Sequence, residues 1–196
     1  ELRPMATIYH GIDPAQYTLR REPEDYLCYL GRFIPGKGPL LAISVAHELG
    51  MRLLLAGPRN PYYRQQIEPL VDGRSVEYVG YVSGAEKDRL LGGARALLYP
   101  VRSPEPFGLV LIEAMMCGTP VAAISLGAVP EIVDEGVTGY CVDSAHELGQ
   151  AALDSLRLDR ARVRDRAEAR FSAERMTADY ARLYQRLALA DPVGVV

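Results

Sequence analysis

Short apolar runs alternate along the chain with longer stretches in which apolar residues recur at helical spacing. The runs have the length of strands and lie at 26–30, 52–56, 76–79, 94–99, 120–124 and 139–142. The helical stretches lie at 40–49, 62–71, 83–91, 108–117 and 129–134, with further helices after Ser144 and through Met176. This alternation is typical of a parallel sheet wrapped by helices. The pattern therefore predicts an α/β domain with a doubly wound, Rossmann-like, six-stranded parallel sheet and helices on both faces.

Two of the expected helices carry a Ser-x-x-Glu pair at their start, Ser83 with Glu86 and Ser144 with Glu147. In a capping box, the serine side chain and the glutamate side chain each bond an amide that the helix leaves unpaired. We therefore expect both serine hydroxyls to cap their helices.

The two ends of the chain lie outside the alternating pattern. Residues 1–25 are expected to be a linker, residues 26–170 form the predicted Rossmann-like domain, and residues 191–196 are a tail. Residues 171–190 form a C-terminal helix whose apolar stripe predicts packing on that domain. The stripe consists of Met176, Tyr180, Leu183, Tyr184 and Leu187. Because the sequence opens on Glu1 in what reads as the middle of a longer polypeptide, we expect an excised domain.

Composition narrows the class of protein. With 196 residues, 48% of them hydrophobic, the chain has the size of one large globular domain. A formal net charge of −3 provides no basic field, so nucleic acid is not an expected partner. Cys28, Cys117 and Cys141 lie in apolar segments without a CxxC pattern and are expected to be free thiols in a reducing compartment. Without a membrane span or signal peptide pattern, we expect a cytoplasmic protein.

The loop after the first strand carries two cations in a glycine-rich setting. Arg32 and Lys37 lie five residues apart between Gly31 and Gly38, which suits a diphosphate. The same letters come close to a P-loop, so a nucleoside triphosphatase is a competing interpretation. Gly38 replaces the hydroxyl residue that would hold magnesium, however, and no apolar strand ends in a metal-binding Asp.

A second loop leads into the helix at 108–117. Pro104 and Pro106 stiffen the backbone around Glu105, and a helix can begin only after them. Gly108 and Leu109 are therefore expected in its first turn, where unpaired amides and the helix dipole favour phosphate. Together with the two loop cations, this turn would clamp a pyrophosphate.

Glu113 follows Gly108 by five residues, which places it roughly 7 to 8 Å along the helix, about the reach from a pyrophosphate to a ribose. Apolar residues flank it, so a lone carboxylate there requires a partner. Glu105 would lie on the other side of the phosphates, toward a sugar. A glycosidase-like pair of carboxylates is an alternative, but it would not need a diphosphate clamp.

The segment Glu105-Pro-Phe-Gly-Leu-Val-Leu-Ile-Glu113 resembles the Glu-x7-Glu motif of glycosyltransferase family 4, which has the GT-B fold and retains the anomeric configuration. The resemblance covers the carboxy-terminal, nucleotide-sugar-binding half of such enzymes. It runs from His10-Gly11-Ile12-Asp13 through Gly31-Arg32-Phe33 and Lys37-Gly38 to Glu131-Ile132-Val133 and Gly136-Val137-Thr138-Gly139. The chain departs from the family at Gly36, where Glu is common, and at His10, where Asn is common.

The resemblance implies transfer of a hexosyl group from a UDP-sugar or GDP-sugar. It assigns Arg32 and Lys37 to the diphosphate and Glu105 to the transferred sugar, and these three are the candidate catalytic residues. The implied nucleotide-sugar contacts also include Gly31, the ribose carboxylate Glu113, backbone at Tyr81 and Val82 for the base, and backbone at Phe107, Gly108 and Leu109. Arg59, which we expect at the ligand edge, is a candidate contact to the base.

We expect no metal ion and no further cofactor, since His10 and His47 are isolated and the chain has no Asp-x-Asp pair. An N-terminal acceptor-binding domain is expected to be missing, so the chain alone would be inactive, and any peripheral membrane contact would be made through that domain. A non-catalytic nucleotide-sugar-binding module and a nucleotide-sugar epimerase of similar fold are the alternatives.

Overall fold

Six parallel strands form the centre of the molecule, as predicted. The computed structural model describes residues 6–190, so the tail at 191–196 and the first five residues of the expected linker lie outside the described residues. The strands are β1 (Leu27–Leu30), β2 (Leu53–Ala56), β3 (Val76–Gly80), β4 (Ala96–Tyr99), β5 (Val121–Ile124) and β6 (Gly139–Val142). Their order is β3-β2-β1-β4-β5-β6 and every pairing is parallel. This is the doubly wound Rossmann order, in which the direction of winding reverses between β1 and β4.

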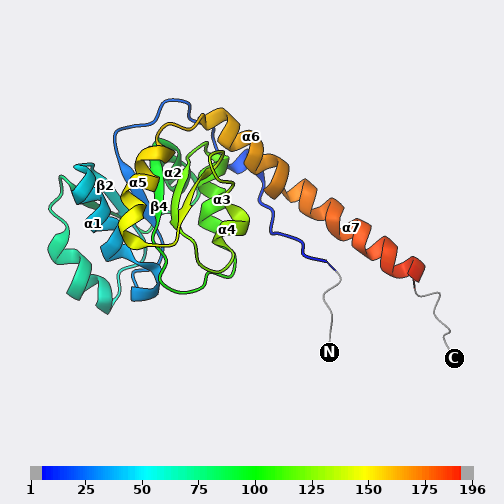
Figure 1. Ribbon diagram of the computed structural model, residues 1–196, viewed down its shortest axis with the longest axis horizontal. Coiled ribbons are helices and arrows are strands. Elements are labelled where there is room, and N and C mark those ends of the chain that lie inside the picture. The colour runs from blue at the N-terminus through cyan, green and yellow to red at the C-terminus, as the bar shows by residue number, and fades with distance from the viewer. Residues whose placement is uncertain (1–5, 191–196) are drawn as a thin grey trace.

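Helices cover both faces of this sheet (Figure 1). They are α1 (Pro39–Leu49), α2 (Gly84–Gly93), α3 (Leu109–Met116), α4 (Val129–Ile132), α5 (Leu148–Ser155), α6 (Arg160–Phe171) and α7 (Ala173–Ala190). Helices α1 and α5 contact each other, and α3 contacts both α2 and α6. Right-handed crossovers place the first pair on one face and the other three on the opposite face. Between β2 and β3 the expected helix is a π-helical turn at Tyr63–Ile67 followed by a 3-10 turn at Glu68–Leu70, because Pro69 lacks the amide that an α-helix requires.

Neither serine hydroxyl caps its helix. Ser83 is the N-cap residue of α2 and Ser144 that of the 3-10 turn at Ala145–Glu147, but neither side chain bonds a helix amide. The Ser144 hydroxyl instead contacts the ring of His146. The Glu86 amide bonds the Ser83 carbonyl oxygen at 3.1 Å, so backbone geometry starts this helix. The capping boxes predicted from the spacing are therefore absent at both positions.

The core lies between the sheet and the helices, and one cation stabilises its edge. Strands β2, β4 and β5 are buried along their whole length. Arg160 is 8% exposed, and its guanidinium donates to three backbone oxygens and to the Thr119 hydroxyl. Burial lowers the pKa of Arg160 to about 10. The three cysteines are free thiols, and burial raises the pKa of Cys28 to about 12.

The segments at both ends of the described chain contact the rest of the domain to different extents. Residues 6–25, expected to be a linker, pack on the domain, and Tyr17 among them is only 8% exposed. Helix α7 projects away from the body (Figure 1), and Tyr180, Tyr184 and Leu187 of its stripe are 41%, 63% and 37% exposed. The stripe is therefore not part of the core of residues 6–190. Periodicity shows that one side of a helix is apolar, but it does not show which surface covers that side. No helix within residues 6–190 combines the length and the apolar character needed to cross a membrane.

Candidate functional site

The reversal of winding between β1 and β4 places two loops around one cavity. In such sheets the loops on either side of the switch point separate and leave a crevice beyond the carboxyl ends of the strands. A cavity of about 320 Å³ lies at this edge. Eight of the eleven predicted site residues line it, namely Gly31, Lys37, Tyr81, Val82, Glu105, Gly108, Leu109 and Glu113. The structure thus brings the loop after β1, the loop after β4 and the start of α3 together.

The loop after β1 turns Lys37 toward the loop after β4. Gly38 has a φ of 66°, and a Cβ atom there would lie 1.9 Å from the Pro100 carbonyl oxygen, so only glycine allows this approach. The Lys37 ammonium forms an ion pair with Glu105 Oε2. The Tyr99 hydroxyl donates to the same carboxylate oxygen at 2.5 Å. One oxygen of Glu105 therefore accepts from both a cation and a phenol.

These contacts determine the charge of Glu105, which is 8% exposed. Burial raises the pKa of the Glu105 carboxyl, but hydrogen bonds from Lys37 and Tyr99 outweigh that effect and hold the pKa below its ordinary value of 4.5. Burial and the carboxylate beside it raise the pKa of the Tyr99 hydroxyl, which stays a donor. Glu105 is thus an ionised acceptor at neutral pH.

The backbone of Glu105 is held from a second side by the segment that leads into α4. The Ala128 amide donates to the Glu105 carbonyl oxygen at 2.8 Å. Gly127 has a φ of 65°, and a Cβ atom there would lie 2.4 Å from Glu105 backbone atoms. A glycine is therefore required for α4 to approach the loop this closely.

The start of α3 forms another wall of the cavity. Gly108 is the N-cap residue with a φ of 87°, and Gly108, Leu109 and Val110 line the cavity. The first amides of a helix have no carbonyl partner within that helix and carry a partial positive charge. An anion in the cavity would face these donors as well as Lys37.

Glu113 lies deeper along α3 and has the partner that its apolar surroundings require. Its Oε1 atom accepts from Lys87 Nζ at 2.6 Å and from the Tyr17 hydroxyl at 3.1 Å. The side chain of Glu113 is 14% exposed. Burial and the neighbouring carboxylate raise the pKa of Tyr17. Neither of these two donors bonds Glu113 Oε2.

Four residues at this site were missed by the sequence reasoning: Tyr17, Tyr29, Lys87 and Tyr99. Tyr17 lies in the segment expected to be a linker, and Tyr29 and Tyr99 lie in apolar strands whose residues point either way. Lys87 could have been singled out from the sequence, because the chain contains only two lysines and the other, Lys37, was already a candidate site residue. Both lie at this cavity, and each is paired with one of the two glutamates of the motif.

Three predicted site residues do not line the cavity. Arg32 is exposed beside Gly31, and its carbonyl oxygen accepts from the Tyr29 hydroxyl at 2.9 Å. Arg59 lies over the rings of Tyr63 and Tyr78, 5.6 and 4.9 Å from their centroids. The expected base contact of Arg59 therefore competes with these cation–π contacts.

The third of these residues, Phe107, is 8% exposed and turns away from the cavity into an aromatic cluster. Its side chain therefore packs against the protein, which leaves only its backbone for the predicted ligand contact. Among residues 6–190, no three His, Cys, Asp or Glu side chains are grouped so that they could hold a metal ion.

The model of the family described as "Glycosyl transferases group 1" matches residues 15–171. The chain belongs to this family. The D-inositol 3-phosphate glycosyltransferases of Mycobacterium tuberculosis and Mycobacterium bovis are 35% identical to it over 164 residues, which are 76% of this chain and 34% of theirs. The chain thus spans about a third of the length of these curated relatives.

Solved structures agree with the fold. The crystal structure of AviGT4, a glycosyltransferase involved in avilamycin A biosynthesis, has a TM-score of 0.80 and 31% identity over 94% of this chain and 58% of that one. Sucrose-phosphate synthase from Thermosynechococcus elongatus has a TM-score of 0.78 and 27% identity over 94% of this chain and 53% of that one. HepE of Anabaena, solved in complex with UDP and glucose, has a TM-score of 0.77 at 22% identity over 91% of this chain and 56% of that one. The chain therefore has the Rossmann-like α/β fold found in these glycosyltransferase structures, over somewhat more than half of their length.

Proposed function

We propose that the chain is the donor-binding part of a retaining glycosyltransferase that transfers a hexosyl group from a UDP-sugar or a GDP-sugar. The observation that carries the proposal is the arrangement of two lysine–glutamate pairs around one cavity at the switch point of the sheet. Lys37 with Glu105 lies beside the amino end of α3, and Lys87 with Glu113 lies further along that helix. A diphosphate fits the first position and a ribose the second.

Each group has a defined task in this proposal. Lys37 and the first amides of α3 stabilise the negative charge that develops on the leaving diphosphate, which is where fixed donors contribute most to rate. Glu105 Oε1 accepts from hydroxyl groups of the sugar and fixes its orientation. Glu113 Oε2 accepts from the ribose. Because these donors supply the positive charge, the proposed reaction requires no metal ion and no further cofactor.

One structural relative supports a nucleotide sugar as the donor. HepE has been solved with UDP, with UDP and glucose, and with UDP-glucose. Its identity to this chain is only 22%, so the donor of HepE supports the class of ligand and not the particular base or sugar. Retention of configuration rests on the resemblance of the Glu105 to Glu113 segment to family 4.

We also propose that a second, acceptor-binding domain completes the active site. The chain spans about a third to somewhat over half of the relatives' length. Helix α7 carries an apolar stripe with Tyr180 41%, Tyr184 63% and Leu187 37% exposed, a surface that a further domain would cover. The chain by itself is then expected to bind donor but to transfer almost nothing.

Calorimetric titration of UDP, GDP, UDP-glucose and GDP-mannose tests donor binding directly. Lys37→Ala should weaken the bound nucleoside diphosphate about tenfold or more, because a charge-assisted hydrogen bond contributes about 1.5 to 3 kcal/mol. The control is Arg74→Ala, an exposed residue just before β3, at the opposite edge of the sheet. Equal affinity of the Lys37→Ala variant and the wild type for every ligand would refute the diphosphate clamp.

Product analysis with a radiolabelled donor separates the alternatives. An epimerase would convert the nucleotide sugar without an acceptor, and a non-catalytic module would release nothing even when joined to its second domain. The proposal expects transfer only in the full-length enzyme. Abundant transfer by the 196-residue chain alone would contradict it.

A further inference from the structure

Two segments far apart in the sequence are joined beside the loop that carries Glu105. The Ile12 amide donates to the Phe171 carbonyl oxygen and the Ala173 amide donates to the Ile12 carbonyl oxygen, both at 2.9 Å. A Cβ atom on Gly11 would lie 2.4 Å from the Ser172 carbonyl oxygen, so the two backbones are in direct contact. Residues 9–12 are therefore joined to the junction of α6 with α7 by backbone contacts.

An aromatic cluster connects this joined unit to the loop. The ring of Phe107 lies 4.8 Å from that of His10, 6.3 Å from that of Tyr9 and 6.1 Å from that of Phe171. Tyr9 and Phe171 are themselves 6.1 Å apart in an edge-to-face arrangement. Such separations are those of favourable aromatic pairs. Phe107 follows Glu105 by two residues, so the cluster holds one side of the loop.

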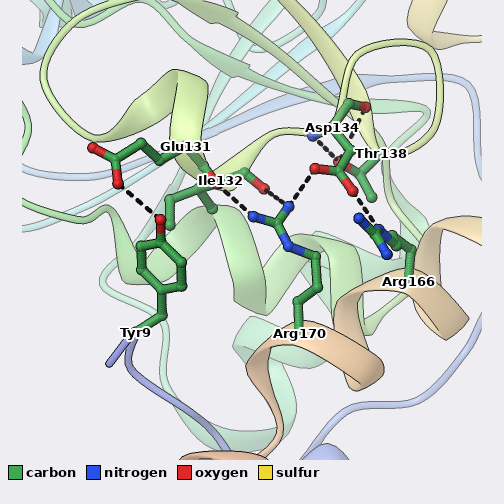
Figure 2. A network of polar contacts seen from close by, with 7 residues as sticks. All are labelled: Tyr9, Glu131, Ile132, Asp134, Thr138, Arg166 and Arg170. Carbon is green, nitrogen blue, oxygen red and sulfur yellow. Dashed lines mark hydrogen bonds and ion pairs between the residues drawn. The ribbon is translucent and has the colours of Figure 1, made fainter. Parts of the chain in front are cut away.

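A polar network connects the same unit to the other side of the loop (Figure 2). The Tyr9 hydroxyl donates to Glu131 Oε2 at 2.8 Å, at the exposed side of α4. Arg170 on α6 donates to the Glu131 and Ile132 carbonyl oxygens and pairs with Asp134. Helix α4 in turn holds the Glu105 backbone through the Ala128 amide.

Two side chains of this set take part in both connections: Arg170, whose guanidinium lies 4.7 Å from the centroid of the Phe171 ring, and Tyr9, which contacts Phe107 itself. The ring of Tyr9 packs on Phe107 and its hydroxyl bonds Glu131. We infer that Tyr9 is a positioning residue for the loop at 105–108, acting through Phe107 on one side and through α4 on the other. The inference rests on the proposed function, in which this loop orients the sugar of the donor.

A loss of this positioning should affect the binding of UDP and of UDP-glucose to different extents. The pair of Lys87 and Glu113, proposed for the ribose, lies on α2 and α3. Glu105, proposed for the sugar, lies on the positioned loop. Loosening that loop lowers the fraction of molecules in which it is correctly placed and reduces affinity by that fraction. A change at Tyr9 should therefore reduce the affinity for UDP-glucose more than the affinity for UDP.

Calorimetric titration of UDP and UDP-glucose into the wild-type chain, Tyr9→Phe, Tyr9→Ala and Tyr184→Ala tests this difference. Tyr184→Ala is the matched control, because it removes an exposed tyrosine of α7. Tyr9→Ala should weaken UDP-glucose about tenfold and UDP less than threefold. Tyr9→Phe keeps the ring and should recover part of the loss. Equal losses for the two ligands, or none for either, would overturn the inference.

Hydrogen exchange provides a second measurement that needs no ligand. Protection of the Ala128 amide, which bonds the Glu105 carbonyl oxygen, should fall about tenfold in Tyr9→Ala and stay unchanged in Tyr184→Ala. Amides of β2 should keep their protection, which excludes a general loss of stability. Unchanged protection at Ala128 in Tyr9→Ala would refute the positioning role. If the wild-type chain binds neither UDP nor UDP-glucose, the proposed donor is wrong, and hydrogen exchange alone decides the inference.

Discussion

Replacing Glu113 by glutamine removes one charge from the deeper part of the cavity and keeps the shape of the side chain. In the structure the Glu113 carboxylate is 14% exposed, and its Oε1 atom already accepts from Lys87 and Tyr17. In the proposed site, Oε2 accepts from the ribose. Glutamine offers one acceptor oxygen instead of two, so either Lys87 and Tyr17 or the ribose loses its acceptor.

The expected loss follows from the strength of a hydrogen bond to a charged group, about 1.5 to 3 kcal/mol. UDP affinity should fall roughly 10- to 150-fold in Glu113→Gln. Inorganic pyrophosphate, which would contact only Lys37 and the start of α3, should bind both proteins alike. The fold should persist, because Lys87 is 24% exposed and can turn its ammonium toward water.

Titration of UDP, 2′-deoxy-UDP and pyrophosphate into wild type and Glu113→Gln provides the assay. Glu113→Gln should reduce the affinity for 2′-deoxy-UDP less than the affinity for UDP, because 2′-deoxy-UDP already lacks one of the two ribose hydroxyls. Glu86→Gln is the matched control, an exposed glutamate on neighbouring α2. A loss for pyrophosphate as large as that for UDP would show that Glu113 does not read the ribose.

Three further predictions concern pH, the buried cation and a glycine. Because the folded-state pKa of Glu105 lies below its ordinary value of 4.5, ionised Glu105 stabilises the fold above that pH, and the contribution is lost as pH falls through the folded-state pKa. Urea unfolding between about pH 7 and pH 3.5 should show the stability difference between wild type and Glu105→Gln shrinking below about pH 4.5, whereas a constant difference would contradict the ionised pair. Arg160→Met should lower the free energy of unfolding by about 3 kcal/mol or more, because it leaves several buried carbonyl oxygens without a donor. A decrease in urea unfolding no larger than that of Arg162→Met, which changes an exposed arginine, would contradict this. Gly38→Ala should weaken pyrophosphate binding, because the Cβ atom would lie 1.9 Å from the Pro100 carbonyl oxygen and displace the Lys37 turn; unchanged binding and melting temperature would refute that constraint.

The strands and the position of the site follow from the sequence because both depend on local patterns. Apolar runs locate β1 to β6 within about two residues, those of β1 to β4 end at a glycine or a proline, and the carboxyl ends of parallel strands meet at one edge by topology alone. Glycines and prolines around Glu105 also restrict where α3 can begin, and it begins at Leu109. These features need no knowledge of distant contacts.

The remaining features depend on contacts between distant residues. The spacing of Lys37 predicts a phosphate ligand, but it does not show that Lys37 pairs with Glu105, 68 residues away. Tyr17 meets Glu113 across 96 residues, from a segment without any periodic pattern. Ser83 and Glu86 have the spacing of a capping box, yet the tertiary structure leaves the hydroxyl unused. Similarly, the stripe of α7 is visible in the sequence, but periodicity does not show what packs against it, and Tyr180, Tyr184 and Leu187 are exposed.

The two lysines provide the most direct test of the central proposal, that this cavity holds a nucleoside diphosphate with the phosphates at Lys37 and the ribose beside Lys87. Incorporation of lysine labelled with ¹³C at Cε gives only two lysine signals, which Lys37→Arg and Lys87→Arg assign. Titration with UDP should shift both signals with one dissociation constant, and titration with pyrophosphate should shift the Lys37 signal alone. If UDP at millimolar concentration moves neither signal, or if pyrophosphate moves that of Lys87 as strongly as that of Lys37, the proposed donor site is wrong.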